Sequence, residues 1–187
     1  MSKTVNKKIF IIRHCEAKGQ EFHAPLTENG KKQAVKLAKF LSSLQIDRII
    51  SSPYVRATQT IEPFSELKTI PIEIDPRLKE RVLSTKSLSN WLELLAATFD
   101  DKDLKFEGGE SSREAQSRIV RVIDEIMEST EKRTAIVAHG NIIALLLHYY
   151  NEPFGFEEWK NLSNPDVYQL QVKQNDLFID RIWKDNL

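Results

Sequence analysis

The sequence TAIVAHGNIIALLLHY, residues 134–149, contains the clearest indication of fold class in the chain. Residues 134–138 are nearly all apolar, a pattern typical of a strand buried on both faces of a parallel sheet. His139 and Gly140 interrupt the pattern, and residues 142–149 continue it as an apolar helix. A buried strand that leads through a glycine turn into a buried helix indicates an α/β fold.

Strand and helix patterns alternate through the first half of the chain as well. Residues 8–13 form a short apolar run, and Thr27 begins a helix with apolar residues at the 3.6-residue period. Residues 47–51 and 70–74 are strand-like, and Pro53 favours a helix start between them. This alternation predicts an α/β/α sandwich, in which helices cover both faces of a mostly parallel central sheet.

The segment after these units departs from the alternation. Residues 87–99 show a helical pattern far from any recurring unit, so we expect an insertion or lid at about 81–107. Ser111 and Glu114 have the spacing of a capping box, and they precede an amphipathic helix. Residues 167–172 and 177–183, separated by a turn-rich stretch, predict a terminal hairpin.

The composition limits the class of protein. The 187 residues, 41% of them apolar, suffice for one domain, expected to span residues 1–187. Lys plus Arg and Asp plus Glu both number 27, so no net field attracts nucleic acid or a membrane surface. The early apolar run at residues 9–12 is too short for a signal peptide or a membrane span, and we expect a cytoplasmic protein. Cys15 is the single cysteine, which excludes an intrachain disulfide and a Cys-rich zinc site.

Basic and imidazole side chains follow three of the expected strands. Arg13 and His14 end the first strand, Arg56 follows the second, and His139 follows the buried strand quoted above. The carboxyl ends of parallel strands share one rim, where ligands of α/β sheets bind. Two guanidinium groups can hold a phosphate there, two imidazoles can approach its phosphorus, and Gly140 allows close approach at a helix N-terminus. The sequence therefore predicts a phosphate site.

Six short motifs occur in order between residues 9 and 143. They read IRHCEA (12–17), PLTENG (25–30), SSPYVRATQT (51–60), LKE (78–80), GGES (108–111) and VAHG (137–140). Their order and content resemble the motifs of the histidine phosphatase superfamily, which includes the phosphoglycerate mutases. The resemblance implies a phosphoglycerate mutase-like three-layer fold.

The resemblance also implies roles for the residues of the rim. His14 is expected to be the nucleophile and phosphate carrier, with Arg13, Arg56, His139 and Gly140 around the phosphate and Glu80 as proton donor. A neutral imidazole can attack phosphorus without a metal, and the fixed donors offset the charge of the transferring group. Glu80 must then be protonated near neutral pH, which a dianionic phosphate and partial burial favour. We therefore expect metal-independent phosphomonoester hydrolysis through a phosphohistidine, with no cofactor.

Cys15 occupies a position where the family usually has glycine. A thiol nucleophile is disfavoured, because Glu21 stands where Cys-based phosphatases have arginine. We therefore expect Cys15 to be a small buried residue. The sequence leaves open whether the backbone keeps the family geometry here and whether oxidation of Cys15 silences the site. His23 and His148 lie outside the motifs, and we expect surface or helix positions without metal-ligand partners.

Two alternatives to hydrolysis remain. The mutases of the family usually carry a longer segment between Glu16 and Leu26, so the short one here favours a phosphatase over cofactor-dependent mutase-type transfer. A non-catalytic phosphate-binding module is the weaker alternative, because the chain retains both a nucleophile and an acid. The substrate is expected to be a small phosphorylated molecule or a phosphoprotein; neither its identity nor the oligomeric state follows from the sequence.

Overall fold

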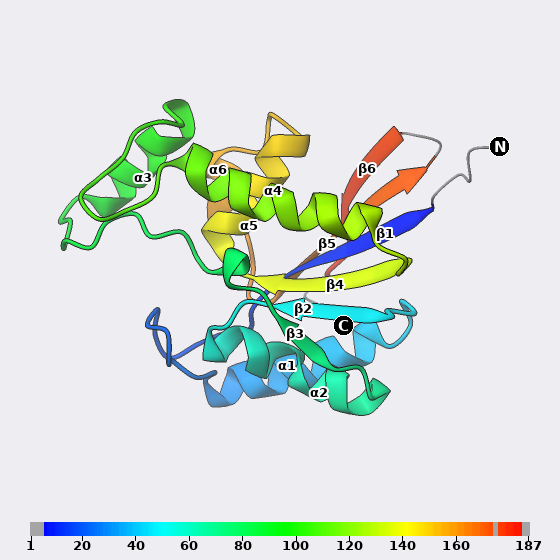
Figure 1. Ribbon diagram of the computed structural model, residues 1–187. Helices are drawn as coiled ribbons and strands as arrows, with labels where there is room; N and C mark the ends of the chain where they lie inside the picture. The colour runs from blue at the N-terminus through cyan, green and yellow to red at the C-terminus, as the bar shows by residue number, and fades with distance from the viewer. Residues whose placement is uncertain (1–5, 174–175, 185–187) are drawn as a thin grey trace.

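A six-stranded sheet lies between two helical layers in the computed structural model, which describes residues 6–173 and 176–184 (Figure 1). The strands are β1 (Lys7–Arg13), β2 (Arg48–Ser51), β3 (Ile72–Ile74), β4 (Arg133–Ala138), β5 (Asp166–Lys173) and β6 (Asp176–Arg181). Their order is β3-β2-β4-β1-β5-β6, with the first four mutually parallel and β5 and β6 antiparallel. The predicted mostly parallel α/β/α sandwich is confirmed.

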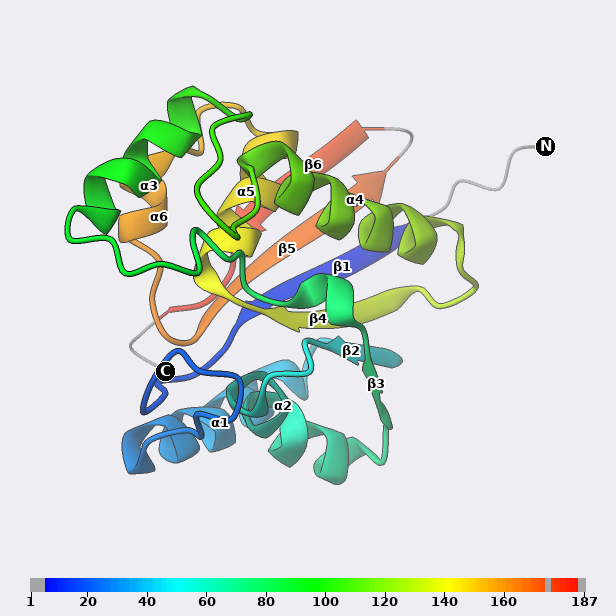
Figure 2. The ribbon, with the colours of Figure 1, turned by 60° about the vertical axis from the view of Figure 1, so that its left-hand side comes forward.

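Two hydrophobic cores lie on opposite faces of the sheet. Helices α1 (Glu28–Leu41) and α2 (Val55–Lys68) cover one face, and α4 (Ser112–Glu128) and α5 (Gly140–Tyr150) cover the other, with α6 (Phe156–Lys160) packed next to α5 (Figures 1 and 2). Successive side chains of a strand point to opposite faces. Ile9 and Ile11 of β1 accordingly join the α4–α5 core, whereas Phe10 and Ile12 join the α1–α2 core.

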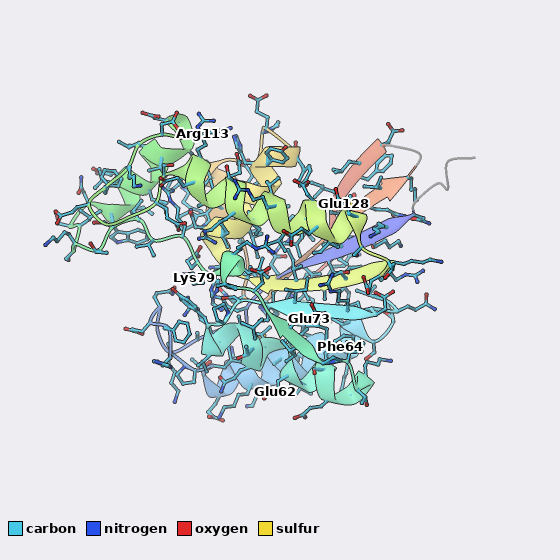
Figure 3. All side chains as sticks on the ribbon, in the orientation of Figure 1. Glu62, Phe64, Glu73, Lys79, Arg113 and Glu128 are labelled. Atoms are coloured by element: carbon cyan, nitrogen blue, oxygen red, sulfur yellow. The ribbon has the colours of Figure 1, made fainter. Side chains whose placement is uncertain are left out.

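Helix α2 illustrates how side chains sort between core and solvent. Glu62 lies on its outer side, whereas Phe64 of the same helix is buried against the sheet (Figure 3). The helix begins at Val55 rather than at Pro53, so the predicted start is wrong by two residues. The reason is that Ser52 still donates its N–H to the carbonyl of Val137, at 2.9 Å, and so keeps the chain on the sheet.

Other helix and strand ends show which sequence patterns determine a boundary. The side chain of Thr27 caps α1 by accepting the N–H of Gly30 at 2.9 Å, and the capping box at the start of α4 is confirmed. Helix α3 (Trp91–Asp100) starts four residues later than predicted, and the residues before it include Ser and Asn, which have low helix propensity. Strand β6 ends at Arg181, because Trp183 turns away to pack against Phe40 of α1, 5.3 Å between ring centroids.

The hairpin and the remaining short elements complete the fold. The hairpin of β5 and β6 is confirmed, but part of its predicted turn, residues 174–175, lies outside the described residues. A 3₁₀ helix, η1 (Pro76–Leu78), follows β3, and the sequence patterns did not indicate α6. None of the helices within the described ranges is long and apolar enough to cross a membrane.

The carboxyl ends of β1, β2 and β4 meet at one end of the sheet. Lys79 lies at this end, between the helical layers (Figure 3). Helices α3 and α6 extend beyond the same end, on the side of α4 and α5 (Figures 1 and 2). The segments that carry the predicted site residues therefore converge here.

Candidate active site

Two histidines and an arginine form the centre of the site. His14 follows β1 and His139 follows β4, two neighbouring parallel strands, and their ring centroids are 5.1 Å apart. Arg56, in the first turn of α2, is fully buried and donates from Nε to Nε2 of His14 at 3.2 Å. The structure thus brings together side chains that are 42 and 125 residues from His14 in the sequence.

The hydrogen bonds of His14 determine which ring nitrogen carries the proton and which is unprotonated. Its Nδ1 lies 2.7 Å from the carbonyl oxygen of Cys15, which only accepts, so Nδ1 carries the proton. Its Nε2 accepts from Arg56 and is therefore unprotonated. Burial lowers the pKa of His14 to about 3, and the cationic Arg56 and Arg13 add to this effect. The imidazole is thus neutral at physiological pH, with the lone pair of Nε2 directed at Nε of Arg56.

His139 is held by residues of the SSPYVRATQT motif. Its Nε2 lies 2.7 Å from the hydroxyl oxygen of Ser52, and its ring centroid is 4.8 Å from that of Tyr54. The guanidinium of Arg56 lies over the same tyrosine, 4.6 Å from the ring centroid. Burial, followed by the neighbouring His14 and Arg56, holds the pKa of His139 well below its ordinary value. The sequence analysis did not assign a role to Ser52 or Tyr54.

Several buried polar atoms of the site lack a hydrogen-bond partner. They are Nε of Arg13, Nη2 of Arg56, Nδ1 of His139, and both amide atoms of Asn141. Among the described residues, the remaining atom of this kind is Oγ1 of Thr134. Buried polar atoms are nearly always paired, because an unpaired one costs roughly 1–3 kcal/mol. Their concentration around His14 therefore indicates a site for a polar ligand, and the two guanidinium groups favour an anion.

Asn141 was not predicted as a site residue. A signal was present, because Asn141 is the polar residue that begins an otherwise apolar helical run. Its side chain is 6% exposed, so it does not serve as a solvent-facing cap.

Gly140 packs against the guanidinium of Arg13. A Cβ at this position would lie 3.1 Å from Cζ, Nε and Nη2 of Arg13, tighter than ordinary contact. Arg13 is also held from the other side, since its Nη1 donates to the carbonyl of Leu162 at 2.7 Å. Gly140 therefore keeps space for the arginine side chain.

Glu80 binds the N-terminus of α5 with its side chain. Oε2 accepts the N–H of Asn141 at 3.0 Å, and Oε1 accepts those of Ile142, at 3.0 Å, and Arg81, at 2.8 Å. The first-turn N–H groups of Asn141 and Ile142 are thus occupied by a carboxylate. These two N–H groups are therefore not free to donate to a phosphate in this arrangement.

Arg118 of α4 fixes the backbone around Glu80 through hydrogen bonds. It donates to the carbonyls of Lys79, at 2.8 Å, and Glu80, at 3.3 Å. Glu110 of the GGES motif orients Arg118 through two hydrogen bonds of 2.8 and 2.9 Å. This pair explains why a glutamate 30 residues from Glu80 belongs to the site, a role that the sequence analysis did not assign.

A family model described as the histidine phosphatase superfamily (branch 1) matches residues 9–184. The chain belongs to the histidine phosphatase superfamily. A probable phosphatase from Schizosaccharomyces pombe is 31% identical over 163 residues, which cover 80% of this chain and 76% of that protein. This relative and the family match confirm the prediction of a phosphatase enzyme.

Two further known proteins resemble this histidine phosphatase. A probable phosphoglycerate mutase, GpmB of Escherichia fergusonii, is 29% identical over 159 residues, or 75% of this chain and 73% of that one. The structure of a mycobacterial glucosyl-3-phosphoglycerate phosphatase has a TM-score of 0.75 at 22% identity, covering 95% of this chain and 97% of that one. The structural likeness shows the shared fold.

Cys15 is a core residue of this histidine phosphatase. Its side chain is fully buried, and its N–H donates to Oγ1 of Thr60 at 2.8 Å. Burial raises the pKa of the thiol to about 12, so the thiol stays protonated. This supports the expected structural role and argues against oxidation, because the thiolate is the reactive form.

The remaining histidines lie where they were expected. His23 is exposed, and His148 is in α5, with Nδ1 2.9 Å from the carbonyl oxygen of Phe154. In the described part of the chain, no group of three or more His, Cys, Asp and Glu side chains is placed to hold a metal ion.

The buried neutral His14 is expected to make the enzyme sensitive to mild acid. The unfolded chain binds a proton here near pH 6.5, whereas the folded protein binds it only near pH 3. The free energy of unfolding therefore decreases as the pH is lowered from the first value to the second. Urea unfolding at pH 7 and at about pH 4.5 should show that the wild type loses roughly 2–3 kcal/mol more than His14→Gln. His23→Gln is the control and should follow the wild type. Equal losses for all three proteins would contradict a buried neutral His14.

Proposed function

We propose that this histidine phosphatase hydrolyses phosphomonoesters in two steps without a metal ion, through a phosphohistidine on His14. The observation that carries the proposal is the group of unpaired buried polar atoms around the unprotonated Nε2 of His14. Such an arrangement has a nucleophile and donors for an anion in the same place before any ligand binds.

In the first step, Nε2 of His14 gives up the hydrogen bond from Nε of Arg56 and attacks phosphorus, and the bond to the leaving oxygen breaks. Nε of Arg13 and Nη2 of Arg56 donate to the phosphoryl oxygens, as does the amide of Asn141. Nδ1 of His139 can also donate, provided that Nε2 accepts the hydroxyl proton of Ser52. These donors offset the negative charge that spreads over the equatorial oxygens.

Glu80 supplies the proton that the leaving oxygen needs. Oε1 accepts two hydrogen bonds and Oε2 only one, so Oε2 has room for a transferable proton. In the second step the same carboxylate removes a proton from water, whose oxygen attacks the phosphohistidine. Release of phosphate breaks the N–P bond and regenerates the neutral imidazole.

We further propose that residues 81–107, within a single domain, cover the leaving group as a lid. Arg81, Leu83 and Trp91 of this segment line a cavity that also contains Arg13 and Glu80. The placement of the enzyme in the cytoplasm stays a prediction, as does the absence of a bound cofactor.

Mutase-type transfer is the alternative function. The segment between Glu16 and Leu26 is fixed by Arg56, whose Nη1 donates to the carbonyls of Gln20 and Glu21 at 3.0 and 2.9 Å. In this position the segment contributes Gln20 to the walls of the cavity, and no charged side chain. The segment therefore has no charged side chain in the cavity that could hold a phosphoglycerate for transfer, and hydrolysis is favoured over mutase-type transfer.

The phosphoenzyme can be trapped directly. We expect rapid mixing with a radiolabelled aryl phosphate in EDTA, followed by an alkaline quench, to leave acid-labile label on the peptide that contains His14. Chase with water alone should release phosphate, whereas isomerisation of phosphoglycerate after addition of 2,3-bisphosphoglycerate would identify a mutase. Phosphate binding without any labelled enzyme or turnover would refute the catalytic proposal.

A further inference from the structure

A cavity of about 420 Å³ leads from the phosphate site toward the lid segment. Its inner end is formed by Arg13, Glu80, Gly140 and Asn141, which belong to the site described above. Glu80 also lines a second hollow, with Tyr54 and Lys79. A phosphomonoester bound at His14 whose leaving group enters the cavity beside Arg13 would place that group in the outer half. The walls of that half carry apolar and aromatic side chains: Leu83, Leu95, Trp91 and Trp159.

The two tryptophans come from two helices that are fixed to each other. Trp91 is the first residue of α3, and Trp159 lies in α6; these helices are side by side in both views (Figures 1 and 2). Phe156 of α6 stacks on Trp159 at 5.4 Å between centroids, and Phe99 of α3 contacts Phe156 edge-on at 6.0 Å. The aromatic contacts therefore hold both walls of the cavity in place before a substrate binds.

Trp91 exposes apolar surface that a bound ligand would cover. Its side chain is 51% exposed, although its ring is large and its helix packs on the protein through other residues. An indole that lines a cavity mouth loses water-exposed apolar area when a ring stacks on it. Trp91 is thus placed to contact the leaving group and not to stabilise the empty fold.

Among the described residues that line the outer half of the cavity, none offers a free cationic group to an acidic substrate. Arg81 lines it but is 6% exposed, and each of its three side-chain nitrogens donates to protein atoms. Nε and Nη2 donate to the carbonyl of Glu110, and Nη1 donates to the hydroxyl of Thr98. A carboxylate or second phosphate in this half would lose its hydration and approach Glu80 without gaining an ion pair.

We infer that the leaving group of the substrate is an uncharged ring held between Trp91 and Trp159. The inference rests on the proposed phosphatase function, and it names the substrate class: small monophosphate esters whose alcohol carries a flat, neutral ring. It excludes phosphoglycerate-like substrates, in which the alcohol carries a carboxylate.

Three alkyl esters with chemically similar leaving oxygens test the inference: 2-phenylethyl phosphate, glycerol 1-phosphate and 3-phosphoglycerate. We expect kcat/KM for 2-phenylethyl phosphate to exceed the other two values by at least about tenfold. Trp91→Ala should lower kcat/KM for 2-phenylethyl phosphate by about tenfold and leave hydrolysis of glycerol 1-phosphate within about twofold. Leu92→Ala is the matched control, because Leu92 is an exposed apolar residue of the same helix that does not line the cavity.

Binding of non-hydrolysable phosphonates separates this inference from the proposed function. Calorimetry should show tighter binding of 2-phenylethylphosphonate than of 3-phosphonopropionate, and Trp91→Ala should remove the difference. If this holds while no ester is hydrolysed, the ring site stands and the catalytic proposal fails. If 3-phosphoglycerate is hydrolysed as well as 2-phenylethyl phosphate, or Trp91→Ala changes all esters equally, the inference is overturned while the phosphatase remains.

Discussion

Replacing His14 with alanine is expected to lower kcat/KM for aryl phosphate hydrolysis by about 10⁴-fold or more. The variant loses the imidazole nitrogen that accepts from Nε of Arg56 and attacks phosphorus in the proposed mechanism, while the unpaired polar atoms of Arg13, Arg56 and Asn141 remain. Water would have to replace the nucleophile without an equivalent base. Initial rates in EDTA, with each ester below its KM, give the measurement.

Phosphate binding serves as the internal control for that loss. Calorimetry should show that His14→Ala still binds inorganic phosphate, because the donors belong to other residues. His23→Ala should keep full activity, since His23 is exposed and outside the site. Residual hydrolysis above about 1% of wild type in His14→Ala would mean that the main route does not pass through a phosphohistidine on this residue.

The fold was predictable because its central strands, β1 and β4, are short, mostly apolar and buried on both faces. Residues 134–138 and 8–13 pair along their whole length as β4 and β1, so a continuous apolar run was sufficient to identify each. Side chains that follow such strands necessarily meet at one rim, which brings His14 and His139 together. The position of a site residue is therefore easiest to predict from the sequence where it follows directly from the strand that precedes the residue.

Contacts between distant segments were not predictable in the same way. The hydrogen bonds from Asn141 and Ile142 to Glu80 join residues 61 and 62 positions apart, and no local pattern specifies them. The same holds for Arg118, whose charge looks like that of any solvated helix residue until η1 packs beside α4. The short helix α6 was missed because five residues give too little periodicity to detect.

These distant contacts also give structural roles to two residues of the motifs. Glu110 acts through Arg118 on the backbone of Glu80, and Gly140 leaves space for Arg13. Neither residue needs to touch phosphate to belong to a motif. The resemblance to a family thus drew attention to residues whose contacts become clear only in the three-dimensional arrangement.

Glu80→Gln is expected to have an effect that depends on the leaving group. For an alkyl ester such as 2-phenylethyl phosphate, kcat should fall by about 10²–10³-fold, because the alkoxide cannot leave without a proton. For 4-nitrophenyl phosphate the fall should be about tenfold or less, since nitrophenolate is a stable anion. The measurement is kcat and KM for both esters, and KM should change little because Glu80 is not among the donors to phosphate.

The comparison between the two esters separates proton transfer from a structural role. Glutamine retains an oxygen that can accept the N–H groups of Ile142 and Arg81, but its amide nitrogen cannot accept that of Asn141. A purely structural defect of this kind would slow both esters equally. Glu107→Gln, in an exposed ion pair with Lys86 on the lid, controls for the loss of one negative charge and should leave the ratio of the two kcat values unchanged. If Glu80→Gln lowers both kcat values by the same factor, Glu80 positions α5 and another group must protonate the leaving oxygen.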